Sequence, residues 1–317
     1  MRVPLSVALL FVLTGSLLAQ NGKSAVDRVA AQNALFDEQY ESDLRNFPER
    51  ATAFGDYRYN DKLADRSLDA IARNDKIDRD FLARLEAIPT AGFSDADQLS
   101  HDLLARVLQQ RITDYDLKEY EMPINQQSGI HTSLADLPLS VPLDSVKHYE
   151  DYVARLHQIP RVLSQTMEVL RAGIRDKLMP VRFLLEKLPA QCQGIIDADP
   201  FLQPTKKYPA GISAEDQKRL TQQITEAINT EVIPAYKAFA VFVRTEYAPA
   251  GRSKLSITSL PDGEKRYEND IYARTTTHMA PEEIHQLGLR EIDRIEAEMT
   301  AIAKKEGFPD LASFRAS

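Results

Sequence analysis

The sequence predicts an all-α protein, a multi-helix bundle-like array with long irregular loops and at most one short strand or hairpin. Two observations carry this prediction. From residue 24 onward apolar residues recur every three or four positions, which is the period of one face of an α-helix. Alternation of apolar and polar residues, the pattern of a half-buried strand, is nearly absent, and residues 254–258 are the one candidate for a short strand.

Residues 1–19 have the layout of a cleavable signal peptide. Arg2 gives a positive start, residues 3–18 are mostly apolar, and Ala19 is a small residue before a polar stretch. The apolar run is shorter than the roughly 20 residues of a membrane span, although an uncleaved anchor is the alternative. We therefore expect cleavage after Ala19, an exported protein in the periplasm or outside the cell, and no membrane span after cleavage. No cysteine lies near the cut, which argues against a lipoprotein anchor.

The first half of the chain contains three predicted helices, at residues 26–47, 67–88 and 94–115. Pro48 should end the first helix, and Ser67 and Ser94 are good N-caps for the others, because a serine hydroxyl accepts a free backbone N–H. Residues 49–66, rich in Tyr, Asp and Gly, are expected to form a loop. Residues 121–143 contain three prolines and are expected to form a second long loop, a feature that is often functional.

The second half continues the helical pattern. Asp144 is expected to cap a helix that ends at Ile159, and Pro160 to begin the next one. Pro180 should lie at the first position of a helix that ends near Ile196. A long helix should follow Ser213, with a kink at Pro234 because proline removes a backbone hydrogen bond.

The last residues predict a turn at 260–263, a short helix around Tyr267, and a helix over 281–306 that Gly307 closes. Asp310 then begins a further helical pattern just before the chain stops. We interpret this as a truncation, so that residues 20–317 would be the helical N-terminal part of a larger domain. Helices built to pack on a missing half should expose apolar surface, and the chain alone is expected to be marginal or self-associating.

Composition excludes some classes of partner. The chain has 47 acidic and 39 basic residues, a net charge of −8, with no basic face, so nucleic acid is not an expected partner. The single cysteine, Cys192, lies in an apolar helical stretch and is expected to be a buried small hydrophobe.

The motifs of common catalytic sites are incomplete. A helical zinc peptidase site needs two histidines one turn apart, but His278 and His285 are seven residues apart, about 10 Å along a helix. Glu282 and His285 form one Glu-x-x-His unit, and a di-iron bundle would need a second one. Residues 127–129 lack the strand-turn-helix setting of a serine nucleophile. We therefore predict no catalytic residue and no metal ligand within this chain.

Several stretches, in order, resemble the bacterial domain of unknown function 885. They are residues 48–63 with Asp65-Arg66-Ser67, residues 122–131, residues 155–160, Arg171-Ala-Gly173 with Pro180, Leu260-Pro-Asp-Gly263, Tyr267, Thr275-Thr-Thr277 and residues 281–289. The resemblance implies an exported helical protein about twice this length, similar to zinc metallopeptidases of the gluzincin type, whose zinc motif lies downstream of the 281–289 helix. Zinc is therefore implied for the full-length protein and no cofactor for this chain. Ala280 stands where the family tends to have a capping hydroxyl, a loss that should cost about 1 kcal/mol.

The resemblance leaves only candidate substrate-binding residues, and these are Asn125, Gln126, Gln127, His131, Tyr267, Thr277, Glu282 and His285. Amide side chains can both donate to and accept from a peptide backbone. For each residue the alternative is loop-to-helix hydrogen bonding that fixes the scaffold.

Three functions remain open from the sequence. The leading one is the N-terminal scaffold and cleft wall of an exported zinc-metallopeptidase-like protein, whose partners are a peptide substrate and its missing C-terminal half. The chain alone would be inactive. The alternative is a non-catalytic helical binding or interaction module of the cell envelope. A metal–carboxylate bundle enzyme is the third, disfavoured because ligands are lacking.

Overall fold

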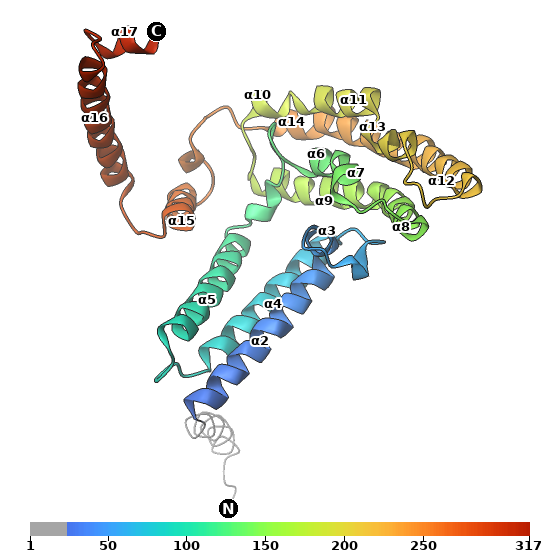
Figure 1. The fold of residues 1–317 in the computed structure, drawn as a ribbon, viewed down its shortest axis with the longest axis horizontal. Helices are drawn as coiled ribbons and strands as arrows, with labels where there is room; N and C mark the ends of the chain where they lie inside the picture. Colours follow the sequence, from blue (N-terminus) through green and yellow to red (C-terminus); the bar gives the residue numbers. More distant parts are fainter. Residues whose placement is uncertain (1–23) are drawn as a thin grey trace, which may run out of the picture. The chain divides into compact units, whose positions relative to one another are not determined.

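The computed structural model describes residues 24–317, and nearly all of its regular structure is helical (Figure 1). The predicted signal peptide and its cleavage point lie outside the described residues. The one β feature among residues 24–317 is an isolated bridge between Val181 and Arg252, so the all-α prediction is confirmed. The strand expected at 254–258 is wrong: Ser256 caps a 3-10 turn at Ile257–Ser259 by accepting the N–H of Thr258.

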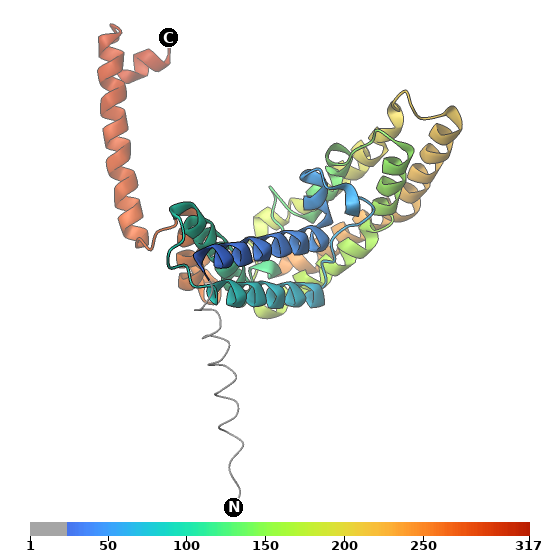
Figure 2. The ribbon, with the colours of Figure 1, turned by 60° about the horizontal axis from the view of Figure 1, so that its bottom comes forward.

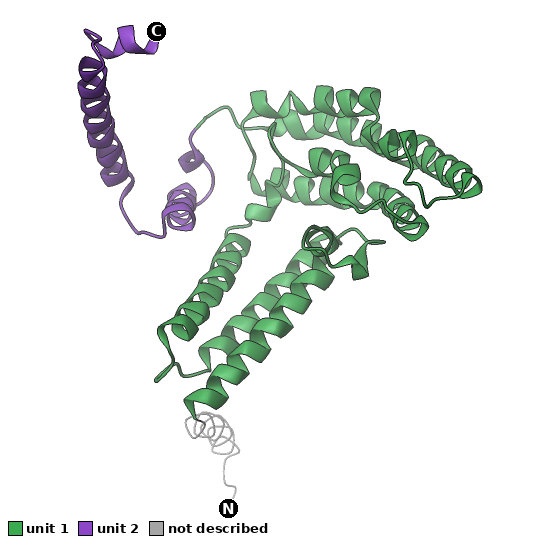
Figure 3. Ribbon diagram, in the orientation of Figure 1, with its two compact units in different colours: residues 1–255 green, residues 256–317 purple. Residues whose placement is uncertain are grey.

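The chain divides into two compact units, one that ends at Leu255 and one that spans Ser256–Ser317 (Figure 3). That residues 20–317 form part of a larger domain stays a prediction.

Three long helices of the first unit follow the predicted pattern closely. They are α2 (Ala25–Asn46), α4 (Leu68–Glu86) and α5 (Asp95–Asp116). Ser67 and Ser94 cap α4 and α5 as expected, each accepting a backbone N–H three residues on. Helix α4 lies beside both α2 and α5 (Figures 1 and 2), and apolar residues including Leu35, Phe81 and Leu108 form their shared core.

An arginine ties these three helices together. Arg111 of α5 donates to Asp43 of α2 at 2.8 Å and to Asp78 of α4 at 3.2 Å. Burial raises the pKa of Asp78, and Arg111 opposes this shift. One guanidinium therefore serves two carboxylates at the point where the three helices meet.

The loop predicted at 49–66 is wrong in its first part. Pro48 ends α2 and also occupies the first position of α3 (Pro48–Ala53), where a missing N–H costs nothing. A 3-10 turn follows at Tyr57–Tyr59. Irregular backbone remains mainly in residues 61–66, which we call the strap.

The second predicted loop is also shorter than expected. A 3-10 turn at Glu119–Glu121, helix α6 (Ile130–Ala135) and helix α7 (Leu137–Ser140) occupy most of residues 119–143. Leu134 and Leu137 are buried, so core packing turns this segment into short helices despite its prolines. Irregular backbone remains in residues 122–129, which we call the amide loop, and in residues 141–145 before α8.

The larger core of the first unit lies among the helices that follow. These are α8 (Val146–Leu156), α9 (Ile159–Asp176), α11 (Leu188–Ala198), α12 (Ala214–Ala227) and α13 (Ile233–Phe242). Ser145, and not Asp144, caps α8, because its hydroxyl accepts the N–H of His148. Cys192 is fully buried in this core, as predicted.

The helix expected to run from Pro180 is wrong. Residue 181 pairs with Arg252 through backbone hydrogen bonds, in which the Arg182 N–H donates to the Arg252 carbonyl at 2.9 Å. Helix α10 (Arg182–Leu185) is therefore short, and Pro189 lies in the first turn of α11.

The long helix after Ser213 is interrupted by two π-helical turns. They lie at Ile228–Val232, directly before Pro234, and at Val243–Tyr247, before the short helix α14 (Ala248–Ala250). Proline cannot donate the backbone hydrogen bond of a regular α-helix, and the first π-helical turn lies just before Pro234. The irregularity thus lies where the sequence predicted a kink.

The second unit contains α15 (Gly263–Thr275), α16 (Pro281–Lys305) and α17 (Leu311–Arg315). Gly307 closes α16 in a left-handed conformation with φ +86°, as predicted. Leu287, Ile292, Ile295 and Ile302 of α16 are each 40–55% exposed. Among residues 24–317, no helix combines the length and the apolar character needed to cross a membrane.

Candidate functional site

The amide loop is held by its own polar groups. The Asn125 side-chain oxygen accepts the N–H groups of Gln127 and Ser128 at 2.8 and 3.0 Å, and the Asn125 N–H donates to the Ser128 carbonyl. This is an Asx turn, which reverses the chain without secondary structure. The Asn125 amide therefore supports the loop, and Gln127 is exposed beside it.

Gly129 closes the loop by close approach. A β-carbon at this position would lie 2.8 Å from Ile124 Cγ2 and 3.0 Å from His131 Nδ1. Ile124 is itself buried, so the neighbouring wall has little freedom to move. The loop packs this tightly only because residue 129 lacks a side chain.

His131 lies in the core and not at the surface. Its ring stacks on Phe239 and its Nε2 lies 3.2 Å from the Gln191 side-chain oxygen. The Gln191 amide nitrogen donates to the Gln126 carbonyl at 2.8 Å, and this fixes which end of Gln191 faces the histidine. Burial lowers the pKa of His131, which favours the neutral ring with its proton on Nε2.

Two polar atoms near this contact have no hydrogen-bond partner among the described residues. They are His131 Nδ1 and Gln126 Oε1, both fully buried. The two residues therefore contribute to packing of the loop on α11 and α13. Their role in substrate binding stays a prediction.

The other four predicted residues belong to the second unit. Tyr267 is 39% exposed on α15, and Thr277 follows α15 with its hydroxyl 2.9 Å from that of Thr275. Glu282 and His285 are exposed on neighbouring positions of the first turns of α16, where Glu282 accepts from Gln286 at 2.7 Å. Ala280 has no hydroxyl with which to cap the start of α16. Glu283 partly compensates, because its carboxylate accepts the Ala280 N–H at 2.8 Å.

A cavity of about 460 Å³ in the first unit is bounded by the amide loop and the strap. Its lining is mainly apolar and aromatic, with Phe47, Ile71, Tyr120 and Ile124 among the side chains. Asp65, Arg66, Asn74, Ser128 and Ser133 add polar groups. A cavity of this size with a few placed polar groups has the character of a small-molecule or peptide side-chain pocket.

The predicted loop thus reaches the cavity through other residues than those proposed. Pro123, Ile124, Ser128 and Gly129 line it, whereas Asn125, Gln126, Gln127 and His131 do not. The strap residues Asp65 and Arg66 were missed, although they belong to the stretch that carried the family resemblance.

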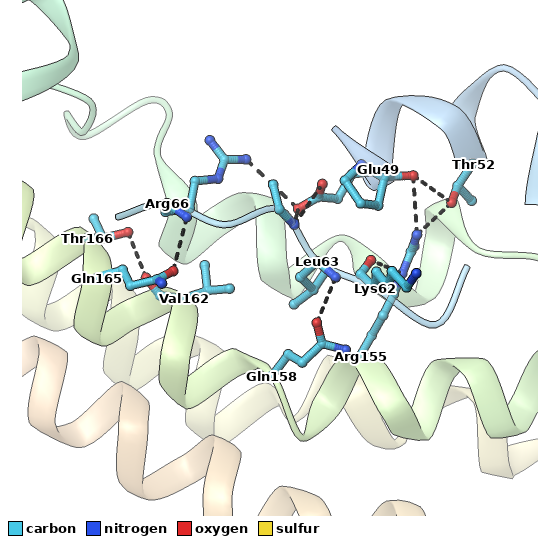
Figure 4. Close-up of polar contacts among 12 residues, drawn as sticks. Glu49, Thr52, Lys62, Leu63, Arg66, Arg155, Gln158, Val162, Gln165 and Thr166 are labelled. Carbon is cyan, nitrogen blue, oxygen red and sulfur yellow. Dashed lines mark hydrogen bonds and ion pairs between the residues drawn. The ribbon is translucent and has the colours of Figure 1, made fainter. Parts of the chain in front are cut away.

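The strap is bound along α9 by side chains, as Figure 4 shows. Gln158 accepts the Leu63 N–H at 3.0 Å and donates to the Asp61 carbonyl at 2.7 Å. Arg161 donates to the Leu63 carbonyl at 2.9 Å. One turn further, Gln165 accepts the Arg66 N–H at 3.0 Å.

A buried arginine secures the other end of this region. Arg155 of α8 donates to the Thr52 hydroxyl at 2.6 Å, the Lys62 carbonyl at 2.9 Å and the Pro48 carbonyl at 3.3 Å (Figure 4). Burial lowers the pKa of Arg155, although guanidinium groups stay charged in proteins. Glu49 adds a carboxylate that accepts the Ala64 N–H at 3.2 Å and lies 3.9 Å from Arg66.

The described residues do not fit a zinc site. Within residues 24–317, no group of three or more His, Cys, Asp or Glu side chains is placed to hold a metal ion. The Glu282–His285 pair is exposed and lacks further ligands of that kind. No chemical step is therefore assigned to a metal held by these residues.

Comparison with known families gives one match over most of the chain. The sequence model of the family described as "Bacterial protein of unknown function (DUF885)" matches residues 48–317. No curated protein matches significantly.

Solved structures share the fold. A crystal structure described as "the putative lipoprotein from Colwellia psychrerythraea" has a TM-score of 0.79 and 17% identity, covering 90% of this chain and 52% of the other. A structure described as "a putative lipoprotein of unknown function from Shewanella oneidensis" has a TM-score of 0.59 and 17% identity, covering 90% and 48%. The chain therefore spans about half the length of these two structures.

Proposed function

We propose, on the premise that the chain belongs to the bacterial DUF885 family, that residues 20–317 form the helical scaffold and one cleft wall of an exported metallopeptidase-like protein. The chain belongs to this family, because the family's sequence model matches residues 48–317. The expectation of peptide hydrolysis comes from the resemblance to gluzincin-type peptidases noted in the sequence analysis. The likeness to two proteins described as "putative" lipoproteins supports a place in the cell envelope or outside the cell.

The observation that carries the proposal is the cavity between the amide loop and the strap. Its aromatic and aliphatic lining suits an apolar side chain of a peptide, and Arg66, Asn74 and Ser128 offer groups for the peptide backbone. The proposal assigns the hydrolytic chemistry, with the zinc that the resemblance implies, to sequence outside these 317 residues. The 317-residue chain is then expected to be inactive alone.

The test uses the complete reading frame, expressed as the exported protein. Bound zinc is measured by elemental analysis, and hydrolysis is followed with a library of internally quenched peptides. About one zinc per chain and zinc-dependent cleavage are expected. A complete protein that binds no zinc or cleaves no peptide contradicts the enzymatic part of the proposal.

A cavity-filling variant then tests the cleft wall. Ser133 is exposed on α6 and lines the cavity, so Ser133→Trp should raise KM by about tenfold or more while zinc content stays unchanged. Ser140→Trp, the same change at an exposed position of α7 that does not line the cavity, is the matched control. Equal KM values for both variants would show that substrate does not use this cavity.

A second candidate is the non-catalytic helical binding module, and the exposed apolar side chains of α16 favour it. Helix α16 exposes three large aliphatic side chains to solvent, those of Ile292, Ile295 and Ile302. Both proposals expect these residues to be covered in the working protein, by the remainder of a longer chain or by a partner.

We expect the 317-residue chain to self-associate in sedimentation experiments, and Ile292→Glu/Ile295→Glu to reduce this self-association. A monodisperse wild-type monomer contradicts the expectation.

A further inference from the structure

A second cavity of the first unit, about 350 Å³ in volume, has an unusual charge. It lies on the side of the strap formed by residues 62–65, against the end of α2, one face of α4 and the start of α9. Its lining contains four cationic side chains, Arg45, Lys62, Arg73 and Arg161, and a single acidic one, Asp65. This excess of positive charge occurs in a chain whose net charge is −8.

Three of the four cations have no acidic partner within residues 24–317. Arg73 pairs with Asp65 at 3.0 Å, which uses the one carboxylate of the cavity. Among the described residues, no ion pair joins Arg45, Lys62 or Arg161 to a carboxylate. Glu38, whose pKa Arg45 helps to lower, is bound directly by Arg84.

The unpaired cations differ in how they are held. Arg161 is half-buried and donates to the Leu63 and Ala64 carbonyls and to the side-chain oxygens of Gln158 and Gln165. All four acceptors are neutral, so the guanidinium is fixed in place while its charge remains uncompensated. Arg45 and Lys62 are exposed at the rim, and the Lys62 ammonium lies 5.6 Å from the centroid of the Tyr59 ring. A cation over a ring face keeps its N–H groups free to turn to a ligand.

The neighbouring cavities differ in their acids. The hollow beside Arg84 shares Arg45 and Arg73 with this cavity, but it also contains the carboxylates of Glu38 and Asp80. The cavity beside Arg50 and Arg111 has three aspartates, and the cavity below the amide loop has one acid and one arginine. Lys206, Lys207 and Lys218 line a hollow near α12, but these are exposed surface lysines without a fixed counterpart of Arg161. Arg45 lies in the last turn of α2, where a positive charge interacts favourably with the helix dipole. This effect explains the presence of Arg45 but not that of Lys62 or Arg161.

We infer that this cavity binds a small organic phosphate monoester. A phosphoryl group places nearly two negative charges and three acceptor oxygens on one centre, which matches three unpaired cations at one cavity. Leu63, Ala70 and Ile77 line the same cavity and offer contact to an apolar body attached to the phosphate. The inference does not depend on peptide hydrolysis, because the cavity and its charges are described without it.

The test is titration calorimetry of the complete exported protein with three probes at low ionic strength. Phenyl phosphate carries both the charge and the apolar body, inorganic phosphate lacks the body, and glutarate carries two charges on separate carboxylates. Phenyl phosphate is expected to bind most tightly, and its affinity should fall as salt rises. Glutarate binding as tightly as phenyl phosphate overturns the phosphoryl assignment, and failure of all three probes overturns the site.

Matched variants locate the binding. Arg45→Gln/Lys62→Gln removes the two exposed cations without touching the contacts of Arg161, and should weaken phenyl phosphate binding by about tenfold. Lys206→Gln/Lys207→Gln removes the same charge from the other cationic hollow and should leave the affinity unchanged. Equal losses in both variants would show that net charge alone attracts the probe. Circular dichroism spectra of both variants, matching the wild type, establish that each is folded.

Discussion

Replacement of Arg155 by methionine tests whether one buried side chain holds the strap region to the helical core. Methionine keeps most of the aliphatic stem and its packing, so the change isolates the guanidinium. Four acceptors lose this donor: the Thr52 hydroxyl and the Lys62, Pro48 and Tyr59 carbonyls. Each is buried or half-buried and cannot easily turn to solvent.

The expected change in the free energy of unfolding follows from these four bonds. A hydrogen bond from a charged donor contributes about 1.5–3 kcal/mol. Removing the donor leaves these acceptors with fewer partners, although the Pro48 carbonyl still accepts the Thr52 hydroxyl at 3.1 Å. The variant also removes the cost of burying the guanidinium, the same cost that lowers the pKa of Arg155. We therefore expect a net loss of about 2–4 kcal/mol in the free energy of unfolding, below the sum of the four bonds.

The assay is urea unfolding followed by circular dichroism, together with limited proteolysis to detect release of residues 54–66. Arg175→Met, at an exposed position of α9, is the control and should change the free energy of unfolding by at most about 0.5 kcal/mol. A loss below about 1 kcal/mol for Arg155→Met, with unchanged proteolysis, would refute the reasoning.

Three further predictions follow from buried groups. The pKa of His131 is lowered in the folded protein, so below its ordinary pKa near 6.5 the unfolded chain binds more protons than the folded one. The free energy of unfolding should therefore fall as the pH drops below that value. His131→Gln should flatten the curve of urea midpoint against pH between pH 7 and 5. Gly129→Ala should cost about 1–3 kcal/mol in urea unfolding because its β-carbon would lie 2.8 Å from Ile124, whereas Gly194→Ala, with open space around it, should be neutral or stabilising. Burial raises the pKa of the Cys192 thiol to about 11, so a thiol reagent at pH 8 should label it only at the rate of unfolding; fast labelling of the folded chain would contradict this.

Sequence patterns within a few residues predicted most of the helices, whereas contacts between distant residues determined where the predictions failed. Ser67 and Ser94 cap helices where expected because an N-cap depends on neighbours within three residues. Residues 49–53 were predicted as loop because Pro48 ends the first helix. Proline is equally suited to begin a helix, and Pro48 begins α3. The helix expected from Pro180 fails because residue 181 pairs with Arg252, a partner that periodicity cannot reveal.

The candidate site shows the same division. The sequence located the amide loop, but the direction of each side chain depends on elements far along the chain. His131 turns inward because Gln191 and Phe239 receive it, and the cavity is completed by Arg66 and Tyr120. The composition of the loop alone does not indicate which distant residues will lie beside it.

The strap also bears on the order in which the chain can fold. Its hydrogen bonds to Gln158 and Gln165 join residues 95, 99 and 100 positions apart, so they cannot form until α9 exists. Closing a loop of that length is slow relative to forming a helix. During synthesis or export, α2–α5 can therefore assemble early around their own small core, while the strap waits for the helix that binds it. A protease acting on the emerging chain would find residues 54–66 open throughout that interval, and a slow step in maturation should disappear in a chain whose strap is deleted.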